Sequence, residues 1–207
     1  MFDKLFNRKR RTDKNRLEQM IPFKGVGTVF ISDLIGFENI SENISPERLV
    51  ELLHKYLTLQ HEIIEDHKGI VIQYEGDTVF AFWHPENKQP NHAQLAFDAS
   101  KKIILAIKEN IHNYSDRPLS ISISLGTDII AGDFFSSLKR FQIVGPAYNI
   151  AETLLKYRDT GNPCILFSSN TIKLLDINTS LLSKVDQIQK KNGKIIEVFA
   201  YTENNDG

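Results

Sequence analysis

Asp33 and Asp77 are the residues of this sequence best suited to chemistry. Asp33 ends an apolar segment at 26–32, which predicts a strand whose backbone then turns through Gly36 into a helix. Asp77 follows Gly76 between two apolar segments, and this predicts the tip of a tight hairpin. Carboxylates presented from neighbouring strand ends hold two divalent cations in metal-assisted displacement at a phosphate. If the two side chains meet in space, we expect an enzyme that acts on a nucleotide.

Composition limits the class of protein. The 207 residues fit one domain, and a net charge of −1 offers no broad surface for nucleic acid. No run of eighteen apolar residues occurs, and a single cysteine, Cys164, excludes an intrachain disulfide. Cys164 lies in an apolar segment and is expected in the core. These features predict a soluble cytoplasmic protein.

The first 22 residues form a basic N-terminal segment. Its basic side chains are Lys4, Arg8, Lys9, Arg10, Arg11, Lys14 and Arg16. A frayed terminus is the simpler interpretation, and contact with a membrane surface or a partner is the alternative.

Apolar periodicity predicts an α+β domain with the order β-α-β-β-α-β. The predicted elements are a strand at 26–32, a helix from Pro46 that stops before Gly69, strands at 70–75 and 78–83, a helix at 92–111 and a strand at 119–125. This order is typical of a ferredoxin-like sheet with both helices on one face. A helix from Pro146, strands at 164–168 and 195–201, and a short helix capped by Ser169-Asn170 are predicted to follow.

Three motifs resemble one family. They are Asp33-Leu34-Ile35-Gly36-Phe37, the hairpin Gly76-Asp77, and Val144-Gly145 followed by Asn149 and Ala151. In this order, within the predicted β-α-β-β-α-β pattern, the chain from about Gly25 to Leu175 resembles the class III nucleotidyl cyclases, the catalytic domains of adenylate and guanylate cyclases. The resemblance implies a cyclase domain over 23–202, with the class III fold, followed by a loose tail at 203–207.

The resemblance also implies how a triphosphate is bound. Asp33 and Asp77 would hold two Mg²⁺ or Mn²⁺ ions, with the carbonyl of Leu34 as a further ligand. One ion would help to ionise the ribose 3′-hydroxyl, which attacks the α-phosphate, and the other would neutralise the triphosphate as pyrophosphate leaves. Backbone amides of Ile35, Gly36, Phe37 and Glu38 would hold the β- and γ-phosphates.

Members of this family complete the site across a head-to-tail homodimer with two sites at the interface. Asn149 stands where the partner's asparagine is expected, whereas Thr153 replaces the arginine expected four residues later. Lys156 and Arg158 lie one turn further on and would substitute only if the helix were placed differently. Near the C-terminus, Lys190 or Lys191 stands where the family often has a phosphate-binding lysine; a solvated lysine pair is the alternative.

Gln73 and Arg140 occupy the positions that bind the base in this family. The guanidinium of Arg140 only donates, so it suits a carbonyl such as O4 of uracil rather than an exocyclic amine. Gln73 both donates and accepts, which suits the N3-H and O4 edge of uracil. The pair therefore favours UTP over CTP. Phe141 and Tyr148 are candidates for stacking on the base or for core packing.

With Gln73 and Arg140 at these base-binding positions, the chain resembles the pyrimidine nucleotide cyclases of bacterial anti-phage defence (Pycsar). The resemblance implies a uridylate cyclase whose cyclic UMP is read by a separate effector protein. Two alternatives stay open. One is a catalytically silent cyclase-like module that binds a nucleotide or a partner, suggested by Thr153. The other is an adenylate cyclase with a remodelled base pocket, which requires Arg140 to face away from the base.

Overall fold

The computed structural model describes residues 22–84, 91–110, 119–137, 140–159, 162, 164–190 and 193–201. The basic segment 1–22, apart from its last residue, and the tail 203–207 lie outside these ranges. The elements are β1 (Phe23–Ile35), α2 (Phe37–Asn43), α3 (Pro46–Asp66), β2 (Ile70–Glu75), β3 (Thr78–Trp83), α4 (His92–Asn110), β4 (Ser120–Phe135), β5 (Arg140–Val144), α5 (Pro146–Leu154), η1 (Leu155–Tyr157), β6 (Cys164–Ser168), α6 (Ser169–Ile172), η2 (Thr179–Leu181), β7 (Leu182–Gln189) and β8 (Ile195–Tyr201).

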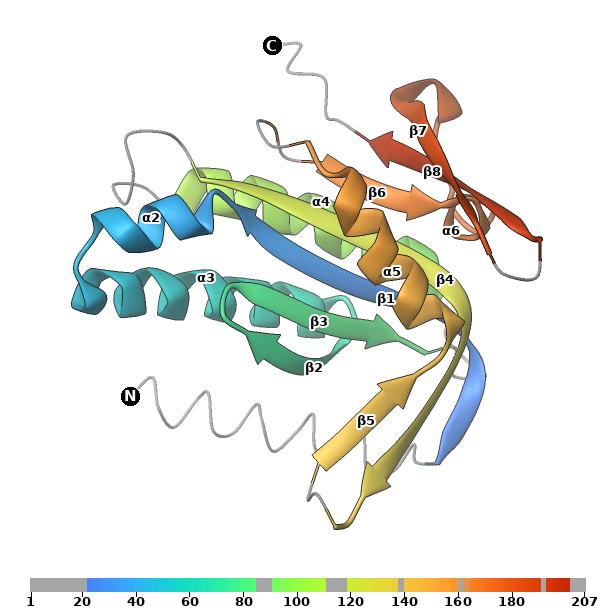
Figure 1. Cartoon of the computed structure of the whole chain (residues 1–207), viewed down its shortest axis with the longest axis horizontal. Coiled ribbons are helices and arrows are strands. Elements are labelled where there is room, and N and C mark those ends of the chain that lie inside the picture. The colour runs from blue at the N-terminus through green and yellow to red at the C-terminus, as the bar shows by residue number, and fades with distance from the viewer. Residues whose placement is uncertain are drawn as a thin grey trace.

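The strands form one sheet with the order β2-β3-β1-β4-β6-β8-β7, and β5 pairs with the far end of β4 (Figure 1). Strand β1 is central and pairs antiparallel with both β3 and β4, whereas β4 and β6 are parallel. The first part of the chain therefore has the predicted β-α-β-β-α-β order.

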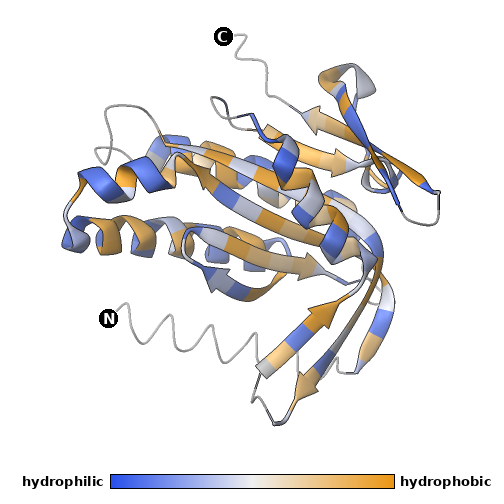
Figure 2. Ribbon diagram, in the orientation of Figure 1, coloured by the Kyte–Doolittle hydropathy of each residue, from blue (hydrophilic) through white to orange (hydrophobic). Residues whose placement is uncertain are grey.

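The two faces of the sheet carry different helices. Along β1, Phe30 and Leu34 belong to the core beneath α3 and α4, whereas Val29 and Ile31 belong to a second core that includes Ala147 of α5. Because successive side chains of a strand point to opposite faces, α5 lies across the sheet from α3 and α4 (Figure 1). Figure 2 shows apolar residues along β3 and β6, and alternating apolar and polar residues along α3 and α4. The prediction that the first two long helices share one face is confirmed.

Two local predictions are confirmed and one is wrong by a residue. Ser45 caps α3 by accepting a hydrogen bond from the Arg48 amide at 3.4 Å. Gly76 adopts a φ of 59° in the two-residue turn between β2 and β3, a conformation that glycine reaches at little cost. The cap of α6 is Ser168, which accepts from the Thr171 amide, rather than the predicted Ser169-Asn170.

The sequence prediction missed two strands and shortened two others. Strand β1 continues to Ile35, and β4 continues ten residues beyond the predicted end at 125, where Gly126 and Asp128 interrupt the apolar alternation. The missed strands are β5, which pairs only with this extension, and β7, an edge strand whose side chains are mostly exposed. Such edge strands carry little apolar periodicity, because only one side of them packs.

Cys164 is buried in β6, with its sulfur 3.5 Å from the Ser122 hydroxyl, as expected for a core residue. Within the described ranges, no helix combines the length and apolar character needed to cross a membrane.

Helix α5 approaches β4 closely at Gly126. A Cβ atom placed there would lie 2.6 Å from the Ala147 carbonyl oxygen and 2.7 Å from the Ala151 amide nitrogen. Both contacts are with backbone atoms, which cannot rotate away. The absence of a side chain at Gly126 therefore determines how near α5 sits to the sheet.

We expect Gly126→Ala to lower the free energy of unfolding by about 1–3 kcal/mol, because α5 must shift outward to make room. Urea unfolding followed by circular dichroism measures this loss. Gly25→Ala is the matched control, since its Cβ would meet the side-chain ring of His84 at 3.1 Å, which is able to move. A loss for Gly126→Ala no larger than that for Gly25→Ala would contradict this packing.

Candidate active site

The structure brings the two aspartates predicted to bind metal to one end of β1. The ladder between β1 and β3 ends at Ser32 opposite Val79, so Asp33 lies next to the β2–β3 turn. The amide of Leu34 donates to Oδ2 of Asp77 at 2.9 Å. The hydroxyl of Thr78 donates to Oδ1 of Asp33 at 3.2 Å. These two hydrogen bonds, one to Asp77 and one from Thr78, therefore join the β2–β3 turn to the end of β1.

The environment of Asp77 disfavours its negative charge. Asp77 is 9% exposed, and burial raises the pKa of its carboxyl above the ordinary value. The hydrogen bond from the Leu34 amide opposes this increase in pKa, and the charge of Asp33 adds to it. A bound cation would remove this electrostatic cost.

The donor set of this site fits hard cations such as Mg²⁺ and Mn²⁺. Two carboxylates lie side by side, and carboxylate oxygens are ligands that such cations prefer. Within the described residues no cluster of three or more histidine, cysteine and acidic side chains occurs. A cation held by two carboxylates would keep open positions for oxygen atoms of a substrate.

The turn predicted to hold phosphates lies beside Asp33. Ile35 ends β1, and Gly36 has a φ of 77°, which redirects the chain into α2. The Ile40 amide donates to the Gly36 carbonyl at 3.1 Å. The side chain of Glu38 is exposed, whereas Phe37 packs partly against the core.

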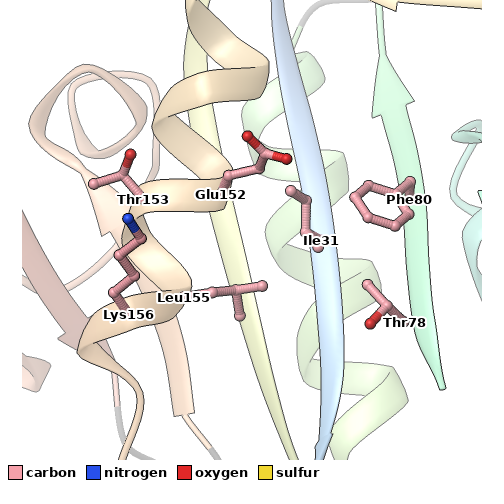
Figure 3. Close-up of a pocket in the computed structure, with 7 residues that line it drawn as sticks. All are labelled: Ile31, Thr78, Phe80, Glu152, Thr153, Leu155 and Lys156. Carbon is pink, nitrogen blue, oxygen red and sulfur yellow. The ribbon is translucent and has the colours of Figure 1, made fainter. Parts of the chain in front are cut away.

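A cavity of about 420 Å³ opens between β1 and β3 on one side and α5 with η1 on the other. It is lined by Ile31, Thr78, Phe80, Glu152, Thr153, Leu155 and Lys156 (Figure 3). Cavities of about 300–1,000 Å³ are typical of sites for small ligands and cofactors. Thr78, which binds Asp33, is part of the lining, so the cavity borders the two carboxylates.

Gln73 faces the same side of the sheet as this cavity because of a β-bulge. Val71 pairs with Ala81, but the next paired residue of β2 is Gln73, which lies opposite Phe80. Phe80 lines the cavity, and paired residues of neighbouring strands share a face. Without the bulge, the alternation from Val71 would direct Gln73 toward α3. Its exposed side chain is thus available to a ligand.

The other predicted base contacts are less direct. Arg140 begins β5 and pairs with Phe135, and its side chain lies outside the described part of the structure. Tyr148 stacks on Phe80, with ring centroids 5.9 Å apart and planes 10° from parallel. Phe141 packs on Phe23 at 6.1 Å and belongs to the core.

Helix α5 carries the residues predicted to act across a dimer. Asn149 is exposed, and its carbonyl accepts a hydrogen bond from the Thr153 hydroxyl at 2.7 Å. That bond is internal to the helix, and Thr153 supplies no positive charge to the cavity. In the C-terminal part, Lys190 pairs with Asp128 of β4 at 3.4 Å, whereas Lys191 lies outside the described residues.

The sequence named Arg158 only as a substitute for the arginine missing at Thr153 and did not predict its contact with Asp33. Arg158 follows η1, and its Nη1 donates to Oδ2 of Asp33 at 2.5 Å. The two residues are 125 positions apart in sequence. No motif indicated this contact, because it depends on where η1 packs against the end of β1.

The model of one family, the adenylate and guanylate cyclase catalytic domain, matches residues 19–202. The chain belongs to this family. Adenylate cyclase 1 of Rhizobium meliloti (strain 1021) is 27% identical over 136 residues, which are 61% of this chain and 20% of that protein. The membrane guanylyl cyclase of Dictyostelium discoideum is 28% identical over 187 residues, which are 88% of this chain and 12% of that protein.

The fold of this cyclase domain is shared with solved structures. The guanylyl cyclase Cya2 aligns with a TM-score of 0.74 and 21% identity, over 89% of this chain and 97% of that one. The chain spans only 12% to 20% of the length of the two curated relatives above.

We expect Asp77→Asn to stabilise the protein at pH 7 in the presence of a chelator. A carboxyl whose pKa is higher in the folded than in the unfolded protein stabilises the fold in acid, below its unfolded pKa of about 3.9. This stabilisation is lost as the pH rises through the pKa of the folded protein. The amide oxygen that this substitution introduces is still able to accept from the Leu34 amide. The melting temperature should therefore rise, on the order of 2 °C, and the difference should vanish in acid.

Differential scanning fluorimetry across pH measures this effect. Asp133→Asn is the control, because Asp133 is an exposed aspartate at the far end of β4. Added Mn²⁺ should raise the melting temperature of the wild type and not that of Asp77→Asn. An Asp77→Asn variant that is no more stable than the wild type at pH 7 would contradict the electrostatic cost assigned to Asp77.

Proposed function

We propose that this cyclase domain converts a nucleoside triphosphate to its 3′,5′-cyclic monophosphate and pyrophosphate. The observation that carries the proposal is the meeting of Asp33 and Asp77 at the end of β1, beside a cavity of about 420 Å³. Carboxylates held this close repel each other, and such a pair is best accounted for by cations that both of them bind. Family membership supports the same chemistry.

The chain's own residues orient the substrate. In the reaction, the ribose 3′-oxygen forms a bond to the α-phosphorus, and the bond from that phosphorus to the β-phosphate oxygen breaks. Asp33, Asp77 and the Leu34 carbonyl would hold two Mg²⁺ or Mn²⁺ ions, which supply charge neutralisation and lower the pKa of the hydroxyl. The amides of Ile35, Gly36, Phe37 and Glu38 would hold the outer phosphates.

The preferred substrate in this proposal is UTP, followed by CTP. Gln73 is exposed on the cavity side of the sheet, and its amide both donates and accepts, as the N3-H and O4 edge of uracil requires. Arg140, as the second base-binding residue, would donate to a carbonyl of the base. A mismatched buried donor costs about 1–3 kcal/mol, or roughly ten- to hundredfold in discrimination.

A head-to-tail homodimer would complete two sites, with Asn149 of one subunit facing the metal-binding aspartates of the other. Exposed apolar side chains on three neighbouring strands support a covered surface. They run along β1, β4 and β5, and are Val26, Ile129, Phe134, Phe135 and Val144. Surfaces that gather apolar side chains in this way commonly mark protein interfaces.

The biological role that fits a pyrimidine product is signalling. Cyclic UMP made in the cytoplasm would be read by a separate effector protein in anti-phage defence. The support for this role is the resemblance of Gln73 and Arg140 to the Pycsar cyclases.

A catalytically silent binding module is the second candidate. It is favoured by Thr153, whose hydroxyl is bonded within α5 and which brings no charge to a transition state.

Incubation with ATP, GTP, CTP and UTP separately in Mn²⁺, with products identified by mass spectrometry, tests the substrate. We expect cyclic UMP as the dominant product. Asp33→Ala and Asp77→Ala should each lower turnover by about 100-fold or more while the circular dichroism spectrum is retained, because charge at the phosphates is no longer neutralised.

Each other outcome has a distinct meaning. Cyclic AMP as the main product would refute the interpretation of Gln73 and Arg140 and indicate an adenylate cyclase with a remodelled pocket. No product from any of the four nucleotides would refute the enzyme and support the silent module.

Mixing two inactive variants tests the shared site. Asp33→Ala and Asn149→Ala carry lesions in different halves of the site, so a mixed dimer keeps one intact site of two. We expect activity to return to about a quarter of the wild-type value, because about half of the dimers are mixed.

The matched control for this mixing experiment is Asp33→Ala with Asp77→Ala. Both of these lesions lie in the same half of the site, so no mixed dimer has an intact site. Recovery in the control, or none in the first mixture, would refute the head-to-tail arrangement.

A further inference from the structure

The ion pair between Arg158 and Asp33 joins two parts of the site that are distant in sequence. Arg158 donates to Oδ2 of Asp33 at 2.5 Å, and Thr78 donates to Oδ1 of the same carboxylate at 3.2 Å. The side chain of Asp33 is 19% exposed, whereas that of Arg158 is 45% exposed. The guanidinium therefore approaches the carboxylate from the solvent side, the side from which a ligand would also enter.

A divalent cation and this guanidinium would use the same oxygen. Both are attracted to Asp33 Oδ2, and a carboxylate oxygen that coordinates a cation has little room for a charged donor at hydrogen-bond distance. The charge of Arg158 also reaches Asp77, whose pKa it lowers against the effects of burial and of Asp33. Arg158 is thus the internal cation of the carboxylate pair.

The backbone keeps Arg158 at the cavity whichever partner its side chain has. Its amide donates to the Leu155 carbonyl at 3.2 Å, and Leu155 and Lys156 both line the cavity with Thr78. A guanidinium displaced from Asp33 would therefore remain beside the carboxylates. The anions that arrive there with the cations are phosphate oxygens, and the planar fork of arginine matches phosphate geometry.

We propose that Arg158 binds the triphosphate of the substrate, and that it leaves Asp33 when a divalent cation takes that carboxylate. The inference rests on the proposed function, because it requires a metal-dependent triphosphate site. Arg158, which lies nine residues after Asn149, would then supply the positive charge at the phosphates that Thr153 does not supply. The alternative is an ion pair that only fastens η1 to β1.

The first measurement is Mn²⁺ affinity without nucleotide, by electron paramagnetic resonance or calorimetry. Because the guanidinium competes for Asp33, Arg158→Gln should bind Mn²⁺ about two- to fivefold more tightly, the factor that corresponds to a partly exposed ion pair. Lys102→Gln makes the same change of net charge on α4, across the sheet, and should leave the affinity unchanged. An unchanged or weaker Mn²⁺ affinity for Arg158→Gln would overturn the proposal.

The second measurement is the affinity for inorganic tripolyphosphate at saturating Mn²⁺. Arg158→Gln should weaken this binding by about tenfold, because a charge-assisted contact is lost, and Arg158→Lys should restore part of it. An ion pair that only fastens η1 would leave tripolyphosphate binding unchanged, and this result would also overturn the proposal.

The two readouts separate this inference from the proposed function. Neither uses a base, so the identity of the preferred nucleotide does not affect them. A wild-type protein that binds no Mn²⁺ would refute the metal-dependent function itself. A wild-type protein that binds Mn²⁺ and tripolyphosphate as tightly as Arg158→Gln does would refute only the role of Arg158. Melting temperatures of all variants show that they are folded, and Arg158→Lys keeps the charge if Arg158→Gln does not fold.

Discussion

The hydrogen bond from the Leu34 amide to Asp77 is the constraint on which the rest of the site depends. It joins the β2–β3 turn to the end of β1 and thereby holds two negative charges together that would otherwise separate. Burial makes the Asp77 charge more costly still. The hydrophobic cores on both faces of the sheet supply the stability that keeps this strained electrostatic arrangement in place.

Two local features of the sheet shape the surroundings of the cavity. The β-bulge between Val71 and Gln73 turns Gln73 to the cavity side, while Tyr74, the next residue, points to α3 and binds His61. On the neighbouring side, Gly126 lets the backbone of α5 approach β4. The bulge thus sets the face on which Gln73 lies, and Gly126 sets how near α5 lies to the strands on that face.

Arg158 brings a positive charge to Asp33 from an element other than helix α5. The helix position expected to carry an arginine holds Thr153, whose hydroxyl is occupied within α5. Arg158 lies beyond the helix, where η1 ends and the chain extends, and it contacts Asp33 directly. The ion pair with Asp33 therefore places a positive charge beside the two carboxylates from within the same chain.

The sequence by itself determined the order of the core elements, the cap of α3 and the turn that carries Asp77. These follow from local periodicity and from turn residues such as Gly36 and Gly76, whose positive φ is a local requirement. Only the tertiary structure decided which face Gln73 occupies, how near α5 lies to the sheet, and that Arg158 reaches Asp33. A bulge, a close backbone approach and a contact across 125 residues depend on packing between distant segments, which no local pattern of residues specifies.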